Sequence, residues 1–312
     1  MTVTRELFRR HPENPILSAT DWPYPVNAVF NPGAAVVGRE TVLIARVEAL
    51  TGISHLAVAR SANGIDGWVV DGVPFLEAVD GVETELWGFE DARAVWVDEL
   101  DLWVITCTAY GPAGPAVYLA TTTDFRAVER QGIVRQPEDK NAALLPEKIG
   151  GKWILFHRPM TAFGGSRGEI LLSRSVDLHD WSAPERVLQP RRGAWWDSAR
   201  IGIGPPPLRT EQGWLVIYHG VKETPAGSIY RVGLALVDLE EPTRVLGRAS
   251  DWVLAPQAPY ERQGDVPNTV FPCGVIHAPE SGEVRLYYGA ADTSICLATA
   301  HIDELLAAIA RS

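Results

Sequence analysis

Five residues that carry positive charge or donate hydrogen bonds stand in strand-like stretches, where such side chains are costly to bury. They are Lys140, Arg158, Arg200, His219 and Tyr230. Polar groups on buried strands persist where they face a wet, functional cavity. Arg, Lys and His bind phosphate strongly through charge-assisted hydrogen bonds. The set therefore predicts an anion site, in which a bound phosphate could itself be a nucleophile.

Few carboxyl groups accompany these side chains. Glu90 and Asp91 are adjacent in the segment GFEDAR, and Asp292 stands far along the chain. An inverting glycosidase needs an acid and a base with room for water between them, and clustered cations would depress the pKa of that base. With phosphate as nucleophile, one carboxyl acting as acid is enough. Because there is no Walker loop or dinucleotide fingerprint, inorganic phosphate is favoured over a nucleotide.

Two neighbouring charges should shift the pKa of Asp91 in opposite directions. A like charge on Glu90 should raise the pKa of Asp91, which suits an acid, whereas nearby Arg93 opposes this shift. The sequence does not decide which influence is larger.

A repeated strand pattern supplies the elements that must position these groups. Short β-branched and aromatic runs separated by Gly, Pro, Asp and Asn predict an all-β chain. One strand type recurs near Ala59, Ala120, Ser173, Ala235 and Ala298, at separations of 61, 53, 62 and 63 residues. This period allows four strands and long loops per repeat. We therefore predict a five-bladed β-propeller, as a single domain over residues 1–312.

Two further segment types precede each copy and end in polar residues. The nearer type contributes Arg46, Tyr110, Arg158, His219 and Asp292, and the earlier type contributes Asn31, Asp91, Asn141 and Arg200. Equivalent positions in a propeller surround one axis, so these side chains are predicted to meet in a central funnel. The alternative is that they are structural and form hydrogen bonds between blades.

Composition narrows the partners. The 312 residues carry a net charge of −11, which disfavours the phosphate attraction on which nucleic-acid binders depend. No stretch approaches the roughly 20 apolar residues of a membrane span, and the N-terminus lacks a signal-like apolar core, so we expect no membrane partner and a cytoplasmic location. The sequence has three cysteines, an odd number, and each lies in an apolar, strand-like segment: Cys107, Cys273 and Cys296. They predict buried thiols, with no disulfide and no metal site.

The last segment, HIDELLAAIARS, predicts a short amphipathic C-terminal helix. This helix could cap the propeller or pack against another subunit, so a homo-oligomer stays open.

At the residues described above, the sequence resembles glycoside hydrolase family 130, the β-mannoside phosphorylases and related β-mannosidases. The similarity runs from about Pro15 to about Asp303 and rests on FNPGAAVV, LIARVE, GFEDAR, KNAALLPEKIGGKWILFHRP, WDSARIGIGPPPLRTEQGWLVIYHGV, YRVGLALVDLEEP and LYYGAADT. The stretch from Trp196 to Val221 is the most specific of these. The family's fold is a five-bladed propeller, as the repeat count also predicts.

The resemblance implies roles for single residues. Asp91 would be the catalytic acid of the Glu-Asp-x-Arg motif, passing its proton to the leaving oxygen, in phosphorylases by way of a sugar hydroxyl. The phosphate site would consist of Lys140, Arg158, Arg200, His219 and Tyr230. Asn31, Arg46 and Asp292 would bind the sugar in the cleavage subsite, and we add Glu90 and Asn141 from the same segments as substrate-binding candidates.

The sequence departs from the family pattern twice. Lys140 stands where Arg is frequent, and Arg200 stands where Lys is frequent. Both keep the positive charge, but Lys140 lacks the planar fork that binds phosphate through two bonds. Family members that hydrolyse lack much of the cationic set and use a Glu as base, so the complete set favours phosphorolysis.

The resulting expectation is an inverting phosphorylase that acts on a β-linked manno-oligosaccharide or mannosyl glycoside. Phosphate would attack C1 and give α-mannose 1-phosphate, with no metal or organic cofactor. The alternatives are an inverting β-mannosidase or another five-bladed glycosidase, and a non-catalytic propeller that binds sugars or proteins. The acceptor sugar would contact outer loops at residues 22–25, 162–167 and 195–196.

Overall fold

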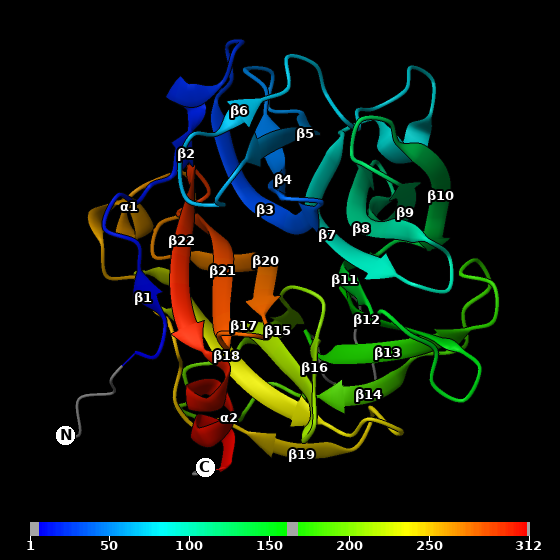
Figure 1. The fold of residues 1–312 in the computed structure, drawn as a ribbon, viewed down its shortest axis with the longest axis vertical. Helices are drawn as coiled ribbons and strands as arrows, with labels where there is room; N and C mark the ends of the chain where they lie inside the picture. The colour runs from blue at the N-terminus through cyan, green and yellow to red at the C-terminus, as the bar shows by residue number, and fades with distance from the viewer. Residues whose placement is uncertain (1–5, 161–167, 311–312) are drawn as a thin grey trace.

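The computed structural model describes residues 6–160 and 168–310, whose strands form five antiparallel sheets around a central axis (Figure 1). The first sheet contains β3 (Ala28–Val37), β4 (Glu40–Glu48), β5 (Ser54–Ser61) and β6 (Val69–Val70). The second contains β7 (Phe89–Val97), β8 (Leu102–Gly111), β9 (Gly114–Thr122) and β10 (Glu129–Arg135). The third contains β11 (Asp139–Leu144), β12 (Trp153–Pro159), β13 (Ile170–Ser175) and β14 (Glu185–Leu188).

Two larger sheets complete the ring. The fourth contains β15 (Arg200–Ile203), β17 (Gly213–Thr224), β18 (Gly227–Val237) and β19 (Val245–Arg248), with β16 (Leu208–Thr210) paired to β17. The fifth contains β20 (Val270–Ala278), β21 (Glu283–Ala290), β22 (Ser294–His301) and β1 (Arg9–Arg10), with β2 (Leu17–Ser18) paired to β22. The helical turns are η1 (Ala19–Asp21), η2 (Glu83–Glu85) and α1 (Pro259–Arg262), and the longer helix is α2 (Ile302–Ala310).

The five-bladed propeller predicted from the repeat is confirmed. The five recurrent centres all lie on the third strand of a blade and are fully buried: Ala59, Ala120, Ser173, Ala235 and Ala298. The earliest segment type of each repeat forms the innermost strand, and these strands surround the axis (Figure 1). Polar residues of that type therefore reach the centre of the molecule.

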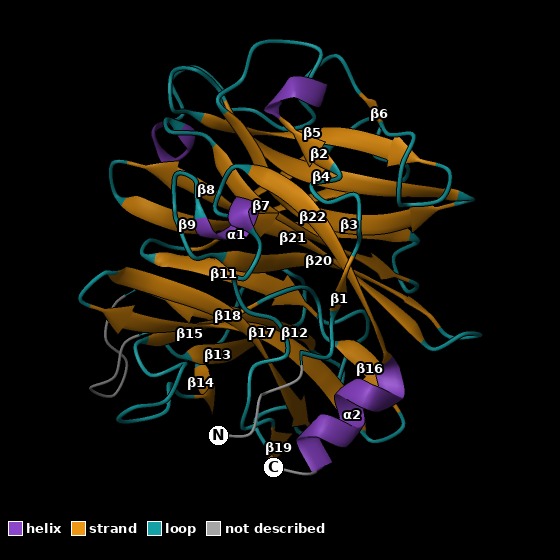
Figure 2. Ribbon diagram, turned by 90° about the vertical axis from the view of Figure 1, so that its left-hand side faces the viewer, coloured by secondary structure: helices purple, strands orange, loops and turns teal. Residues whose placement is uncertain are grey.

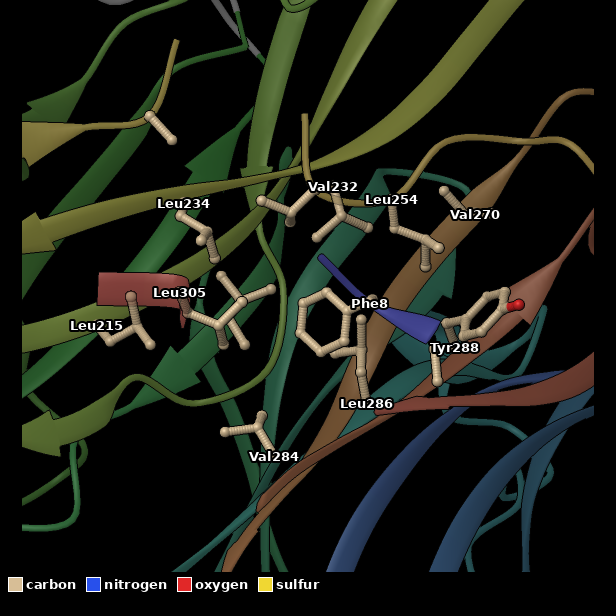
Figure 3. Packing of buried hydrophobic residues seen from close by; sticks show 14 of the residues in the cluster. Phe8, Leu215, Val232, Leu234, Leu254, Val270, Val284, Leu286, Tyr288 and Leu305 are labelled. Atoms are coloured by element: carbon tan, nitrogen blue, oxygen red, sulfur yellow. The ribbon is translucent and has the colours of Figure 1, made fainter. Parts of the chain in front are cut away.

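The core is divided among the contacts between blades. In the described residues, five hydrophobic clusters each join two neighbouring blades. Strand residues are apolar on both faces because each blade has a neighbour on either side. Figure 3 shows the cluster between the fourth and fifth blades, where Leu234, Leu286 and Leu305 pack around Phe8.

The N-terminal segment closes the ring, which the sequence did not predict. Strand β1 pairs with β22, so residues from the start of the chain form the outer edge of the last blade. Arg10 binds Glu261 through Nε to Oε1 at 2.8 Å and Nη2 to Oε2 at 3.0 Å. The Tyr288 hydroxyl also donates to Glu261 Oε1, at 2.8 Å. Because Glu261 is fully buried, losing a partner would leave a costly charge.

Phe8 offers a test of this closure. Its side chain is 2% exposed and lies between the last two blades. Truncation to Ala should lower the free energy of unfolding by about 3 to 5 kcal/mol, since a cavity replaces a buried ring. Urea unfolding measures this loss, with Phe75→Ala, at a half-buried ring of the first blade, as comparison. If wild type and Phe8→Ala unfolded at the same midpoint urea concentration, the N-terminal segment would not stabilise the contact between the last two blades.

The C-terminal helix is confirmed, and its position answers one open alternative. Leu305, Leu306 and Ile309 are buried in the cluster shared by the fourth and fifth blades. Helix α2 lies beside β19 at the edge of the propeller (Figures 1 and 2). Gly247 of β19 permits this approach, because a Cβ there would lie 2.5 Å from Ile309 Cγ2. The apolar face of α2 therefore packs on its own chain.

The three cysteines are buried and unbridged, as predicted. Burial raises the pKa of each thiol above its usual range, which makes them inert. Of the helices in residues 6–160 and 168–310, none has the length and apolar character needed to span a membrane.

One buried polar chain has the residue types of a hydrolytic triad. In the third blade, His157 Nδ1 lies 2.6 Å from Asp139 Oδ2, and His157 Nε2 lies 3.1 Å from Ser173 Oγ. His157 and Ser173 have no exposed surface, so no substrate reaches them. The chain joins the first three strands of the blade and is structural.

Candidate active site

Three inner strands carry the same irregularity where they meet the axis. Asn31, Asp91 and Asn141 have φ values of 46°, 52° and 53°, and strand pairing is interrupted at each of them. Asn and Asp adopt this left-handed conformation more readily than other residues that have a side chain. A bulge redirects the side chain it carries. The repeated Asn or Asp is thus explained by the backbone as well as by the site.

These side chains line a cavity of about 350 Å³. Ten of the eleven predicted site residues line it: Asn31, Arg46, Asp91, Lys140, Asn141, Arg158, Arg200, His219, Tyr230 and Asp292. The eleventh, Glu90, does not line the cavity but forms ion pairs with two residues that do, Arg46 and Lys140. The structure therefore brings together residues from all five blades.

The acidic side of the cavity is organised by Arg46. Its Nη2 lies 3.0 Å from Glu90 Oε1, and its Nη1 lies 3.5 Å from Asp91 Oδ1. Lys140 Nζ lies 3.7 Å from Glu90 Oε2. Asp91 Oδ1 also accepts a hydrogen bond from Asn31 Nδ2 at 2.9 Å. Glu90 therefore holds two cations in place.

The structure decides the balance that the sequence left open at Asp91. Burial raises the pKa of this carboxyl, but Arg46, Arg93 and Lys140 together outweigh burial. The hydrogen bond from Asn31 acts in the same direction. The pKa of Asp91 is therefore below its usual value, and its side chain is a carboxylate near neutral pH.

Asp292 behaves in the opposite way. It occupies the turn after β21 with a φ of 53°. Burial, and then the charge of Asp91, raises its pKa to about 7, while Arg46 opposes the shift. The two carboxyl groups of the cavity thus differ in protonation near neutral pH.

This difference predicts a pH effect on stability. Because Asp292 in the folded state keeps its proton above the pH at which the unfolded chain releases it, the contribution of Asp292 to stability falls as pH rises from about 4 to 7. Asp292→Asn removes this loss. We expect the variant's melting temperature, relative to wild type, to increase across that range and to level off above pH 7. If the difference in melting temperature between Asp292→Asn and wild type were the same at every pH, the raised pKa of Asp292 would be contradicted.

The cationic side contains an arginine without an acid partner. Arg158 donates through Nε at 3.0 Å and Nη2 at 2.8 Å to Asn141 Oδ1. In the described parts of the chain, no carboxylate lies within salt-bridge distance of it. Burial, and then the charge of Arg200, lowers its pKa to about 10. The site holds this guanidinium at a cost that an anion would offset.

Arg200 and Tyr230 form the neighbouring wall. Arg200 Nη2 donates to the Tyr230 hydroxyl at 2.7 Å, and Nη1 pairs with Glu223 Oε1 at 2.6 Å. These strands are adjacent, because β17 pairs with both β15 and β18. Both side chains are therefore oriented before any ligand binds.

His219 is neutral in this cavity. Burial, followed by the charges of Arg158, Arg93 and Arg200, holds the pKa of its imidazole well below the usual value. The ring lies 4.5 Å from Phe271, centroid to centroid, and its Nδ1 has no hydrogen-bond partner among the described residues. Gly202 provides the necessary space, since a Cβ there would lie 2.5 Å from His219 Cε1. His219 contributes hydrogen bonding and not charge.

The predicted equivalence of Tyr110 with Arg46 and Arg158 is wrong. Strand pairing places Thr108 opposite Glu90, as Arg46 lies opposite Phe30 and Arg158 opposite Lys140. Tyr110 lies two residues farther along β8, where its ring packs against Trp87 at 5.7 Å. The same bulge interrupts all three inner strands, so it is the pairing of β7 with β8 that identifies Thr108 as the equivalent residue.

Four cavity residues were missed from the sequence: Met160, Val266, Thr269 and Phe271. Apolar side chains in or beside strands look the same in sequence whether they pack a core or line a site. Arg93 was noted only for its charge. Its Nη1 donates to the backbone oxygen of Asp91 at 2.6 Å, and its Nε donates to that of Gly204 at 3.0 Å. This arginine supports the bulge that positions Asp91.

The loops expected to contact an acceptor sugar differ in exposure. Trp22 and Trp196 are buried, and Trp196 stacks on Tyr218, so both pack the fold. Trp195 is 43% exposed and lines a separate cavity. The segment 162–167 lies outside the described residues.

A metal site is not evident in the described residues. Across 6–160 and 168–310, no three His, Cys, Asp or Glu side chains are grouped so that they could hold an ion.

Known proteins are similar to this chain in sequence and in fold. A family profile described as beta-1,4-mannooligosaccharide phosphorylase, that of glycoside hydrolase family 130, matches residues 7–311. The chain is 32% identical to a beta-1,4-mannooligosaccharide phosphorylase of Ruminococcus albus, covering 97% of this chain and 90% of the relative. It is 38% identical to a beta-1,2-mannobiose phosphorylase of Listeria innocua, covering 82% and 69%.

A solved structure agrees over the full length. The beta-1,2-mannobiose phosphorylase from Listeria innocua, in complex with beta-1,2-mannobiose, superimposes with a TM-score of 0.89 at 30% identity. The match covers 98% of this chain and 99% of that one. With its propeller fold, its central cavity and a profile match over nearly the whole sequence, the chain belongs to glycoside hydrolase family 130, the family of the mannoside phosphorylases.

Proposed function

We propose that this protein is an inverting phosphorylase that cleaves a terminal β-mannoside with inorganic phosphate and releases α-mannose 1-phosphate. The observation that carries the proposal is that one cavity contains both the motif carboxyl, Asp91, and a wall rich in cationic side chains. The relatives named above act as phosphorylases on β-1,4- and β-1,2-linked mannosides, which supports this substrate class.

Phosphate would occupy the cationic side of the cavity. Arg158, Arg200 and Lys140 supply charge, while His219 and Tyr230 supply hydrogen bonds. Among the described residues no carboxylate pairs with Arg158, so its charge is available to the ligand. Phosphate held in this way is oriented for attack before the sugar reacts, which lowers the entropic part of the barrier.

The sugar ring would occupy the acidic side. Asn31, Arg46 and Asp292 provide donors and acceptors for its hydroxyl groups, with Glu90 and Asn141 fixing the cations beside them. Asp292, whose pKa is about 7, is able to donate as well as accept a hydrogen bond near neutral pH.

The proposed chemical step is a single displacement. A phosphate oxygen forms a bond to C1 from the α face while the bond from C1 to the β-glycosidic oxygen breaks, and that oxygen takes a proton originating on Asp91. Phosphate binding prepares this step, because a second negative charge in the cavity raises the pKa of Asp91. The carboxyl thus gains its proton when the nucleophile is present.

A product assay tests the proposal. The purified protein is incubated with β-1,2- and β-1,4-mannobiose, with and without phosphate, and the products are resolved by ³¹P and ¹H NMR. We expect α-mannose 1-phosphate plus mannose from at least one linkage, only when phosphate is present. Release of mannose at the same rate in phosphate-free buffer would replace phosphorolysis by hydrolysis. The configuration of the phosphate ester tests inversion separately.

A further inference from the structure

A second cavity, of about 530 Å³, lies beside the fourth blade and shares no lining residue with the active site. Its wall includes Arg192, Trp195, Lys222, Arg231, Asp251 and Trp252. The mechanism proposed above uses none of them.

Strand β18 separates the two cavities. Tyr230, which lines the active site, pairs with Val221, and Arg231 pairs with Gly220. Neighbouring residues of a strand point to opposite faces. Arg231 is therefore directed away from the active site, and its replacement leaves the active-site wall intact.

The charges of this second cavity are poorly balanced. Its lining has three cationic side chains, Arg192, Lys222 and Arg231, and one carboxylate, Asp251. Among residues 6–160 and 168–310, none of the three cations has a carboxylate within salt-bridge distance. Such an excess is unexpected in a chain with a net charge of −11. It indicates that the cavity is built to receive an anion.

Among the three cationic side chains, Arg231 gives the strongest indication of an anion site. Its guanidinium lies 4.6 Å from the Trp252 ring centroid, and its buried Nε has no hydrogen-bond partner in the described structure. Burial lowers its pKa. Within the described part of the chain, the Lys222 ammonium makes two long hydrogen bonds of 3.4 Å, to the Gly193 backbone oxygen and to Ser198 Oγ. Cationic side chains without a carboxylate partner would be stabilised by a phosphate in the cavity through charge-assisted hydrogen bonds.

The aromatic part of the wall is fixed in place. Arg191 lies 4.5 Å from the Trp195 ring centroid and is itself held by the backbone oxygens of Ala249 at 2.6 Å and Ser250 at 3.1 Å. Trp195 is 43% exposed although it is a large apolar ring. A rigid, exposed indole beside cations suits a ligand that combines a ring with an anionic group.

We propose that this second cavity binds an organic phosphate, with the ligand's ring against Trp195 and its phosphate on Arg231, Arg192 and Lys222. A hexose phosphate and a nucleoside monophosphate share this chemistry. The site requires no catalytic activity and is independent of the phosphorolysis proposed above.

Isothermal titration of the full chain tests the proposal, with α-mannose 1-phosphate, glucose 6-phosphate and AMP as separate probes. We expect Arg231→Gln and Trp195→Ala each to weaken binding of at least one probe about tenfold or more. The matched control is Arg209→Gln, at an exposed arginine that pairs with Glu147, and this variant should bind the probes as wild type does. Trp195→Ala removes a partly exposed side chain and should fold normally, so it tests the site even if Arg231→Gln is destabilised.

The probes also identify the ligand class, since tighter binding of AMP than of the hexose phosphates assigns the site to nucleotides, and the reverse assigns it to sugar phosphates. Equal binding curves for wild type, Arg231→Gln and Trp195→Ala would overturn the proposal. So would binding of neutral mannobiose that depends on Trp195 but not on Arg231. Neither result depends on whether the active site phosphorolyses mannosides.

Discussion

Asp91→Asn is expected to lower the rate of phosphate-dependent mannobiose cleavage by about 10² to 10⁴, the usual contribution of a positioned acid. The amide cannot deliver a proton, and no other carboxyl of the cavity shares the bulge that aims Asp91. Initial rates at saturating mannobiose and phosphate measure the loss. Because the chemical step is affected, the decrease should appear in kcat.

The fold should survive this change. Arg46 keeps its 3.0 Å contact with Glu90. Asn31 can turn its amide so that Oδ1, which now has no partner, accepts from the new amide. The variant should unfold at a modestly lower temperature at neutral pH, since the lowered pKa of Asp91 means that its carboxylate stabilises the folded state.

Asp303→Asn is the matched control for Asp91→Asn, because it makes the same chemical change on an exposed carboxylate of α2. Its rate should equal that of wild type. Near-normal turnover by Asp91→Asn, with correctly folded protein, would remove Asp91 from the role of acid.

Arg158→Gln is expected to raise the KM for phosphate about 100-fold or more. Two charge-assisted hydrogen bonds of roughly 1.5 kcal/mol or more each would be lost, and about 1.4 kcal/mol corresponds to a factor of ten. The KM for mannobiose should change far less, since Arg158 lies on the wall assigned to phosphate. A variant with unchanged phosphate KM would contradict the placement of phosphate.

The same substitution should not destabilise the protein in phosphate-free buffer. A pKa lowered from 12.5 to about 10 means that the charged form is held at a cost of about 3 kcal/mol relative to the neutral form. Wild type should gain stability with rising phosphate concentration as the anion offsets this cost, whereas Arg158→Gln should gain little. Thermal unfolding over a phosphate series measures both effects. Arg209→Gln, at an exposed arginine, should respond to phosphate as wild type does.

The blade count and most of the residues that line the central cavity were predicted from the sequence. The repeat recurs five times, and Ala59, Ala120 and their counterparts lie on the third strand of each blade. Once the repeat is recognised, symmetry brings equivalent polar residues to one axis. Eight of the ten predicted residues that line the cavity come from such positions, and the other two are Lys140 and Tyr230.

Other features depend on contacts between residues far apart in the chain. The closure of the fifth blade by β1 joins Arg9 to Thr299, and no local pattern marks a two-residue strand. The register shifts at Asn31, Asp91 and Asn141 appear only once the strands are paired, and that pairing places Thr108 and not Tyr110 in the equivalent position of the second blade. Spacing in sequence is blind to such shifts.

The sequence by itself determined the propeller, the family resemblance and the residue types at its axis. Only the tertiary structure decided how those residues are charged: Asp91 is ionised, Asp292 holds its proton to about pH 7, His219 is neutral, and Arg158 has no acid partner in the described residues. The physical reason is that a pKa depends on burial and on charges a few ångströms away, and these neighbours come from different blades.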